Sequence, residues 1–154
     1  MSTSPETPTG GAGTLDLERF VPYQLSVLSN VVSQEIAQAY EGLGLAVTEW
    51  RVIAVLGRFP GLSAAGVAER SAMDKVAVSR AVASLLERGL LHRETHGDDR
   101  RRSVLELSEA GWKVHAEVAP LALAYERELL SPLSEAERAE FSRMLERLGE
   151  RYGL

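Results

Sequence analysis

The segment from Asp74 to Gly89 is the part of the sequence that most constrains the fold. Within it, Val78, Val82 and Leu85 recur at the three- and four-residue spacing of one helical face. Asp74 is a residue type that caps helix N-termini, and Gly89 readily adopts the left-handed conformation in which many helices end. We therefore predict an amphipathic helix of about four turns between these two residues.

In the first half of the helix, the opposite face carries mostly short side chains together with polar and charged ones. It carries two cations among short side chains: Lys75, Val76, Ser79, Arg80 and Ala83. Short side chains let a helix backbone approach the bases of DNA, and an Arg side chain can reach a guanine edge or a phosphate. This face is typical of a helix that enters the major groove with its N-terminal end first.

Two short strands are predicted after this helix, at Leu90–Thr95 and Ser103–Leu107. The turn between them is highly charged and contains Asp98, Asp99, Arg100, Arg101 and Arg102. A helix followed by a hairpin with a basic tip is the arrangement of a winged helix-turn-helix. The arginines could enter a minor groove, where the negative potential is deepest. The alternative is a turn that is merely solvated.

In these segments the chain resembles the MarR family of transcriptional regulators. The matching stretches, taken by order and spacing, are Leu62–Arg70, Val76–Val82, Leu85–Leu90, Asp99–Arg101 and Leu107–Gly111. The resemblance extends from Leu17 to Tyr152. It implies a mainly α fold with a small β-wing, in which a winged helix-turn-helix is joined to N- and C-terminal dimerisation helices.

The resemblance also assigns roles in the wing. In the family pattern, an Asp two residues before an Arg orients that Arg for the minor groove. Counting back from Leu107 places this pair at Asp99 and Arg101, and Asp98 with Arg100 is the competing register. Helix and wing together form the predicted DNA-binding set, which is Lys75, Val76, Ser79, Arg80, Ala83, Asp99, Arg100, Arg101 and Arg102.

The rest of the chain divides around the winged helix-turn-helix domain, which we place at residues 45–108. Residues 1–14 are rich in Ser, Thr, Pro and Gly, which predicts a disordered tail. Residues 15–44 and 109–154 carry apolar stripes that a lobe of about sixty residues cannot cover. We expect these helices to pack against a second copy of the chain and form a homodimer. The dimer would read a pseudo-palindromic operator in double-stranded DNA.

Helix starts are predicted from residues that cap N-termini, and these are Thr48, Ser63, Ser108 and Ser134. Ser134 forms a capping box with Glu137. Pro120 lies inside the long helix that begins at Ser108, so we expect a kink or a break between Ala116 and Pro120.

A small-molecule effector is also implied by the resemblance. Trp50 and Arg51 lie near the place where family members bind their effector, and Tyr23 and Tyr40 could line a pocket. The alternative makes the aromatic rings core residues and Arg51 a surface cation. The run Met73–Arg80 resembles the subgroup that responds to hydroxycinnamates or their CoA thioesters, which implies a small aromatic or phenolic ligand or its CoA thioester.

Composition and motifs exclude several other classes of function. The chain has no cysteine, so it can form neither a disulfide framework nor a thiolate zinc site. His92 and His96 lie across a strand and a turn without a further ligand at metal spacing nearby, and we predict no metal site there. A nucleophile elbow and a phosphate-binding glycine loop are both missing, so we expect no enzymatic activity and no cofactor. Neither a signal peptide nor an apolar run of about twenty residues is visible, which predicts a soluble, cytoplasmic protein.

The net charge of -5 is unevenly distributed along the chain. Between Thr48 and Ser108, ten Lys and Arg residues face eight Asp and Glu residues, which gives +2 and leaves -7 for the remainder. The proposed DNA-reading part is thus the less acidic one, as electrostatic steering requires. Two hypotheses remain: a ligand-responsive repressor, and a winged-helix protein-interaction module without sequence-specific DNA binding.

Overall fold

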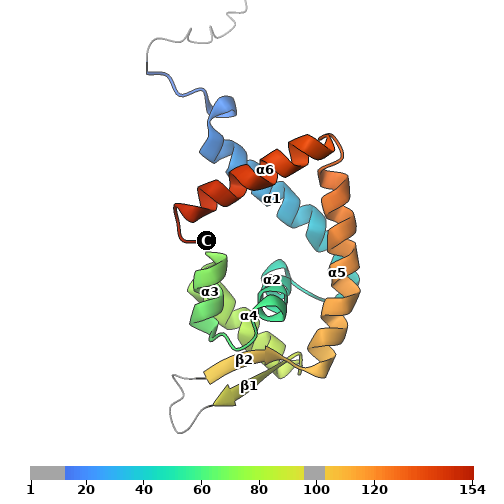
Figure 1. The fold of residues 1–154 in the computed structure, drawn as a ribbon. Helices are drawn as coiled ribbons and strands as arrows, with labels where there is room; N and C mark the ends of the chain where they lie inside the picture. Colours follow the sequence, from blue (N-terminus) through green and yellow to red (C-terminus); the bar gives the residue numbers. More distant parts are fainter. Residues whose placement is uncertain (1–12, 96–102) are drawn as a thin grey trace, which may run out of the picture. The chain divides into compact units, whose positions relative to one another are not determined.

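The computed structural model describes residues 13–95 and 103–154 of the chain (Figure 1). Its elements, in chain order, are η1 (Leu17–Arg19), α1 (Val21–Tyr40), η2 (Glu41–Leu43), α2 (Val47–Arg58), α3 (Ala64–Ser71), α4 (Lys75–Glu87), β1 (Leu91–Thr95), β2 (Ser103–Leu107), α5 (Glu109–Leu129) and α6 (Glu135–Glu150). The fold is mainly α with one small antiparallel sheet, which confirms the predicted class.

The chain divides into two compact units, Met1–Gln34 and Glu35–Leu154, and the boundary falls within α1. In the first unit, the 3-10 helix η1 leads into α1, where Pro22 occupies the first turn and therefore interrupts no helical hydrogen bond. Many apolar side chains of this unit are exposed, among them Val21, Tyr23, Leu25, Val27, Leu28 and Val31. Each of these six exposes between 41% and 55% of its surface.

The hydrophobic core of the second unit is built mainly from α2, α3, α4 and the two strands. Its buried apolar residues are Tyr40, Leu45, Val52, Ile53, Leu56, Val67, Ala68, Val78, Ala81, Val82, Leu85, Leu90, Leu91, Leu105, Leu107 and Val118. The predicted apolar face of α4 is confirmed, because Val78, Val82 and Leu85 each expose 2% or less of their surface. Burial of such a side chain stabilises the fold by about 1.5–3 kcal/mol.

The start of α2 differs from the prediction. Thr48 was expected to be the N-cap, but the helix begins at Val47 and its N-cap is Ala46. The Ala46 backbone N–H donates to Oε1 of Glu49 over 3.0 Å. The carboxylate at the third helical position thus bonds the N–H of the N-cap residue, as in one half of a capping box, and Thr48 lies inside the helix.

The strands β1 and β2 pair in antiparallel register from Leu91 opposite Leu107 to Thr95 opposite Ser103. On its other side, β2 forms a single bridge between Leu105 and Leu62, which lies in the loop between α2 and α3. Leu105 N donates to Leu62 O over 2.8 Å, and Gly61 N donates to Leu105 O over 3.0 Å. The middle of β2 is therefore bonded on one side to β1 and on the other to the loop that leads into α3.

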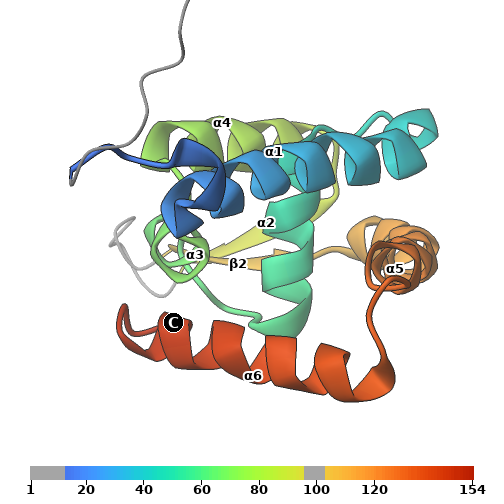
Figure 2. The same cartoon turned by 90° about the horizontal axis from the view of Figure 1, so that it is seen from above.

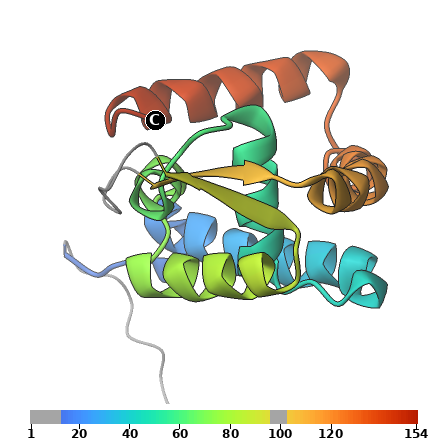
Figure 3. The ribbon, with the colours of Figure 1, turned by 90° about the horizontal axis from the view of Figure 1, so that it is seen from below.

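The helix α5 leaves the end of β2, and α6 returns so that α4 and α6 lie on opposite sides of α2 (Figures 2 and 3). Of the kink or break expected between Ala116 and Pro120, the break is wrong, because α5 is continuous from Glu109 to Leu129, and the kink stays a prediction. Pro120 deprives the Ala116 carbonyl of its helical donor, but both residues face solvent, where water can replace that bond. The capping box of Ser134 and Glu137 is present as predicted.

Several large apolar residues of α5 and α6 remain exposed: Trp112, Leu121, Leu123, Leu129, Phe141, Met144, Leu145 and Leu148. Each exposes between 38% and 54% of its surface. None of the helices in the described ranges has both the length and the apolar character that a membrane span requires.

Candidate nucleic-acid interface

The helix α4 is stabilised by capping residues at both ends and by the burial of one face. Asp74 Oδ2 accepts from the Ala77 backbone N–H over 2.8 Å, which satisfies one of the free donors of the first turn. The helix ends at Glu87, and Gly89 follows with a φ of +71°. Asp74 and Gly89 therefore act as predicted from their residue types, and the buried side chains of α4 leave its opposite face toward solvent.

The helix residues predicted to bind DNA all lie on that exposed face. They are Lys75, Val76, Ser79, Arg80 and Ala83, and Val76 exposes 57% of its surface. Few long side chains project from this face, so a groove of a nucleic acid can come close to the α4 backbone. The structure thus gives these residues the exposure that DNA binding requires, and their roles stay a prediction.

The hairpin carries the second half of the predicted interface. Its strands have the predicted bounds, except that β1 begins at Leu91 rather than at Leu90. The wing residues Asp99, Arg100, Arg101 and Arg102 lie outside the described residues, as does Asp98. Their DNA contacts and both Asp/Arg registers therefore stay predictions.

One exposed cluster on the hairpin combines an imidazole with two carboxylates. His92 Nε2 lies 3.3 Å from Glu106 Oε2 and 3.9 Å from Glu94 Oε1. The three side chains could each offer one ligand atom to a metal ion, since these atoms lie within 4.8 Å of one another. All three side chains are between 39% and 53% exposed, which is equally the geometry of a surface ion pair. His96 lies outside the described residues.

The candidate effector residue Trp50 lies in a row of aromatic rings. Its ring centroid is 6.1 Å from that of Tyr40 and 5.7 Å from that of His115, which in turn lies 5.4 Å from Trp112. Trp50 is half-buried and packs against the hydrophobic core. The row joins the end of α1, the start of α2 and the first half of α5.

Tyr40 is the most deeply buried member of this row, with 1% of its surface exposed. No hydrogen-bond partner for its hydroxyl is found among the described residues. Burial raises the pKa of the Tyr40 phenol above its usual range, and the positive charge of Arg51 offsets part of that rise. Arg51 itself is exposed, whereas Tyr23 belongs to the first unit and is 41% exposed. The roles of Tyr23, Trp50 and Arg51 toward a ligand stay predictions.

A cleft of about 590 Å³ lies between the end of α1 and the second half of α5. Its lining combines apolar and acidic side chains: Glu35, Gln38, Ala39, Leu121, Ala124, Tyr125, Glu128 and Leu129. The Tyr125 hydroxyl donates to Glu35 Oε2 over 2.8 Å. Partial burial, this hydrogen bond and the nearby carboxylates of Glu35 and Glu128 raise the pKa of the Tyr125 phenol.

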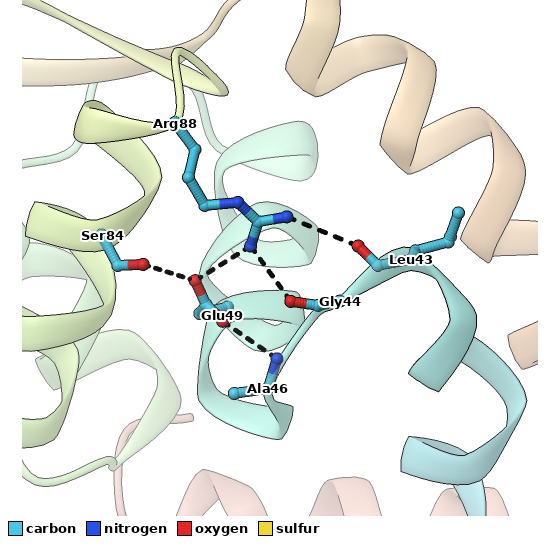
Figure 4. Close-up of polar contacts among 6 residues, drawn as sticks. All are labelled: Leu43, Gly44, Ala46, Glu49, Ser84 and Arg88. Atoms are coloured by element: carbon cyan, nitrogen blue, oxygen red, sulfur yellow. Dashed lines mark hydrogen bonds and ion pairs between the residues drawn. The ribbon is translucent and has the colours of Figure 1, made fainter.

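Sequence reasoning missed a polar cluster that joins α4 to α2 and to the turn after α1 (Figure 4). Its central side chains are Arg88, Glu49 and Ser84, and its other members contribute backbone groups. Ser84 and Arg88 lie 35 and 39 positions beyond Glu49, so no local spacing signals these contacts.

Comparison with known proteins agrees with this architecture. Residues 43–102 match the model of the MarR family. A protein of Thauera aromatica, assigned by name to regulation of the hcr operon, is 30% identical over 97 residues. That match covers 63% of this chain and 58% of the Thauera protein, which is less than two thirds of its length.

Matches of greater extent come from one further relative and from solved structures. The transcriptional repressor Rv2887 of Mycobacterium tuberculosis is 27% identical over 127 residues, which cover 82% of this chain and 91% of the repressor. Its complex with salicylic acid has a TM-score of 0.69 and 26% identity, over 83% of this chain and 95% of that one.

A MarR/EmrR family transcriptional regulator from Acinetobacter sp. ADP1 is similar over more of the fold. Its TM-score is 0.81 at 28% identity, and the match covers 90% of this chain and 99% of that one. The family model covers α2, α3, α4 and β1 but ends before β2, and the match to the Acinetobacter structure covers 90% of this chain. Residues 43–102 of the chain thus match the MarR family model, and the fold as a whole is similar to that of MarR-family transcriptional regulators.

Proposed function

We propose that this chain is a ligand-responsive repressor that binds a pseudo-palindromic operator as a homodimer. One observation carries the DNA-binding part of the proposal. The exposed face of α4 combines short side chains with Lys75 and Arg80, on a helix whose other side is locked in the core. In this proposal Arg80 reads a base edge or a phosphate, Ser79 and Ala83 allow close approach, and Arg101 enters the minor groove.

The homodimer is supported by the exposed apolar residues of α1, α5 and α6. In water, such surfaces are stabilised when a partner covers them. We assign residues 45–108 to the DNA-binding domain, and residues 15–44 and 109–154 to dimerisation. A two-fold dimer would present one α4 to each of two successive major grooves, so the half-sites should lie about one helical turn apart.

The ligand response is supported by relatives. The Rv2887 repressor has been solved with salicylic acid, an aromatic acid with a phenolic hydroxyl. In this chain the row of rings around Trp50 and the Tyr40 hydroxyl lies where the end of α1, α2 and α5 meet. A phenolic ligand or its CoA thioester bound there would therefore contact helices of both the dimerisation part and the DNA-binding domain. A ligand that binds more tightly to the dimer state in which the two DNA-binding domains no longer match the spacing of the operator half-sites would release the DNA. A tenfold preference per site corresponds to about 1.4 kcal/mol.

Footprinting on the region upstream of the chain's own gene, repeated with phenolic acids and acyl-CoA thioesters, tests both parts of the proposal. We expect the protein to protect a pseudo-palindromic sequence, and its affinity for that sequence should fall steeply as the salt concentration rises. Arg80→Ala should relax base preference within the site, and Arg101→Ala should weaken binding. Lys113→Ala is the matched control, because Lys113 is an exposed cation on α5.

Two outcomes would contradict this assignment. If Arg80→Ala and Arg101→Ala bind the operator like the parent, the chosen residues do not read DNA. If the chain binds no duplex at any salt concentration, the alternative of a winged-helix protein-interaction module is favoured instead.

A further inference from the structure

The side chain of Arg88, directly after the last residue of α4, reaches back to the turn between α1 and α2. Its Nη1 donates to the Gly44 carbonyl over 3.2 Å, and its Nη2 donates to the Leu43 carbonyl over 3.4 Å. Gly44 lies in the left-handed region with a φ of +67°, which L side chains rarely adopt. The guanidinium therefore holds the two carbonyls that end the turn after α1.

Glu49 completes this arrangement from the first turn of α2. Its Oε2 accepts from Ser84 Oγ over 2.9 Å and lies 3.4 Å from Arg88 Nη1, while its Oε1 accepts from Ala46 N over 3.0 Å. Only 9% of Glu49 is exposed. A carboxylate with so little access to water needs these partners, so loss of Arg88 would leave a buried charge without its cation.

The cluster joins α4, α2 and the turn after α1, and these elements have different proposed functions. Ser84 and Arg88 belong to the C-terminal end of the recognition helix, whereas Leu43 and Gly44 follow the dimerisation helix α1. The apolar core packs the buried face of α4, but the hydrophobic effect that stabilises this packing has no direction of its own. Hydrogen bonds from both terminal nitrogens of a planar guanidinium, by contrast, depend on its orientation and so fix the direction in which the end of α4 faces.

We propose that Arg88 is a positioning residue for operator binding, which ties the recognition helix to the end of α1 through Leu43, Gly44 and the Glu49–Ser84 pair. In the dimer, this tie keeps the two recognition helices at the spacing and rotation that the operator requires. The inference rests on the proposed function, because it assumes that α4 reads DNA and that α1 belongs to the dimer.

The first test compares specific and non-specific DNA binding of Arg88→Met. This variant keeps the apolar stem of the side chain and removes every donor. We expect operator affinity to fall about five- to tenfold, at the lower end of typical coupling between sites. Affinity for an unrelated duplex and the salt dependence of operator binding should stay unchanged, because the residues proposed to contact DNA are intact. Lys113→Met is the control for loss of one exposed cation.

Two further variants separate positioning from folding and from charge. The double variant Glu49→Gln with Arg88→Met keeps the net charge of the parent, and its loss should not exceed that of Arg88→Met alone. Ser84→Ala removes a single donor and should lower operator affinity less than Arg88→Met does. Circular dichroism and light scattering check that each variant keeps the helical content and the oligomeric state of the parent.

A distance measurement tests the tie without DNA. Because the chain has no cysteine, Gln38→Cys and Glu87→Cys place two spin labels, one near the end of α1 and one at the end of α4. Dilution with unlabelled chain restricts the signal to pairs within one subunit. The distance distribution should be narrow with Arg88 present and broader in Arg88→Met.

The outcomes distinguish the two proposals. Equal operator affinity of the parent and Arg88→Met, or equal distance distributions, would overturn the positioning role and leave the proposed function intact. Absence of duplex binding by the parent, together with a broadened distribution in Arg88→Met, would instead overturn the proposed function and support the tie between α1 and α4.

Discussion

Replacing Gly111 by Ala should destabilise the chain severely, because this position allows α5 to pass directly over the backbone between α4 and β1. A Cβ atom added at Gly111 would lie 2.1 Å from the Leu90 carbonyl oxygen and 3.1 Å from the Leu90 carbonyl carbon. Carbon and oxygen atoms in packed interiors stay apart by more than this, so the two backbones must separate by about 1 Å.

The surrounding hydrogen bonds make that separation costly. Ser108 N donates to the same Leu90 oxygen over 3.0 Å, and Ser108 Oγ donates to Gly89 O over 2.6 Å. Overpacking typically costs about 1–3 kcal/mol, and each of the two hydrogen bonds adds about 1 kcal/mol if it breaks. We therefore expect Gly111→Ala to lower the free energy of unfolding by about 3–5 kcal/mol, which is roughly 6–20 °C in Tm.

Urea unfolding followed by circular dichroism at a fixed protomer concentration measures this loss, because the stability of the proposed dimer would depend on concentration. Gly42→Ala is the matched control, because a Cβ at Gly42 meets no atom within 4 Å and its φ is not in the left-handed region. The control should change stability by less than about 1 kcal/mol. Equal unfolding midpoints for the two variants would show that the close approach of α5 to Leu90 does not limit this position.

Three further predictions each concern one polar group. Asp74→Ala removes the N-cap bond to Ala77 and should cost about 1 kcal/mol in urea unfolding; no loss would mean that the cap is dispensable. Tyr40→Phe removes a buried hydroxyl without a partner among the described residues, so stability should hold within about 0.5 kcal/mol or rise. A clear loss would point to a partner outside them. The raised pKa of Tyr125 favours its neutral phenol in the folded chain, so this contribution is complete below the unfolded pKa and is lost as pH rises through the folded pKa. Between pH 9 and 11 the parent should therefore lose more stability than Tyr125→Phe, and equal losses would contradict the role of the Glu35 contact.

The features predictable from sequence were those whose causes are local. The caps at Ser63, Asp74 and Ser108 each bond to a backbone N–H three residues ahead, and the face of α4 follows from helical spacing alone. The prediction for Thr48 fails because the helix begins at Val47, where Glu49 bonds the N–H of Ala46. The predicted break at Pro120 fails because exposure makes the lost hydrogen bond inexpensive.

What sequence could not predict are contacts between distant segments. Arg88 reads locally as a cation near a helix C-terminus, where it would stabilise the helix dipole. Only the fold brings it to Gly44, which lies 44 positions earlier in the chain. From sequence alone, Gly111 is likewise only a residue that disfavours helix. Its role becomes visible only in the structure, where the Leu90 backbone packs against it.

The bridge between Leu62 and Leu105 has a consequence for how specificity can change in this fold. Because β2 is bonded at Leu105 to the loop before α3, the backbone bonds of this attachment involve no residue between Thr95 and Ser103. Under the proposed function, a segment of a relative grafted between these two residues would change the minor-groove contacts and leave the attachment intact. Divergence of operators among related regulators would need no remodelling of the scaffold.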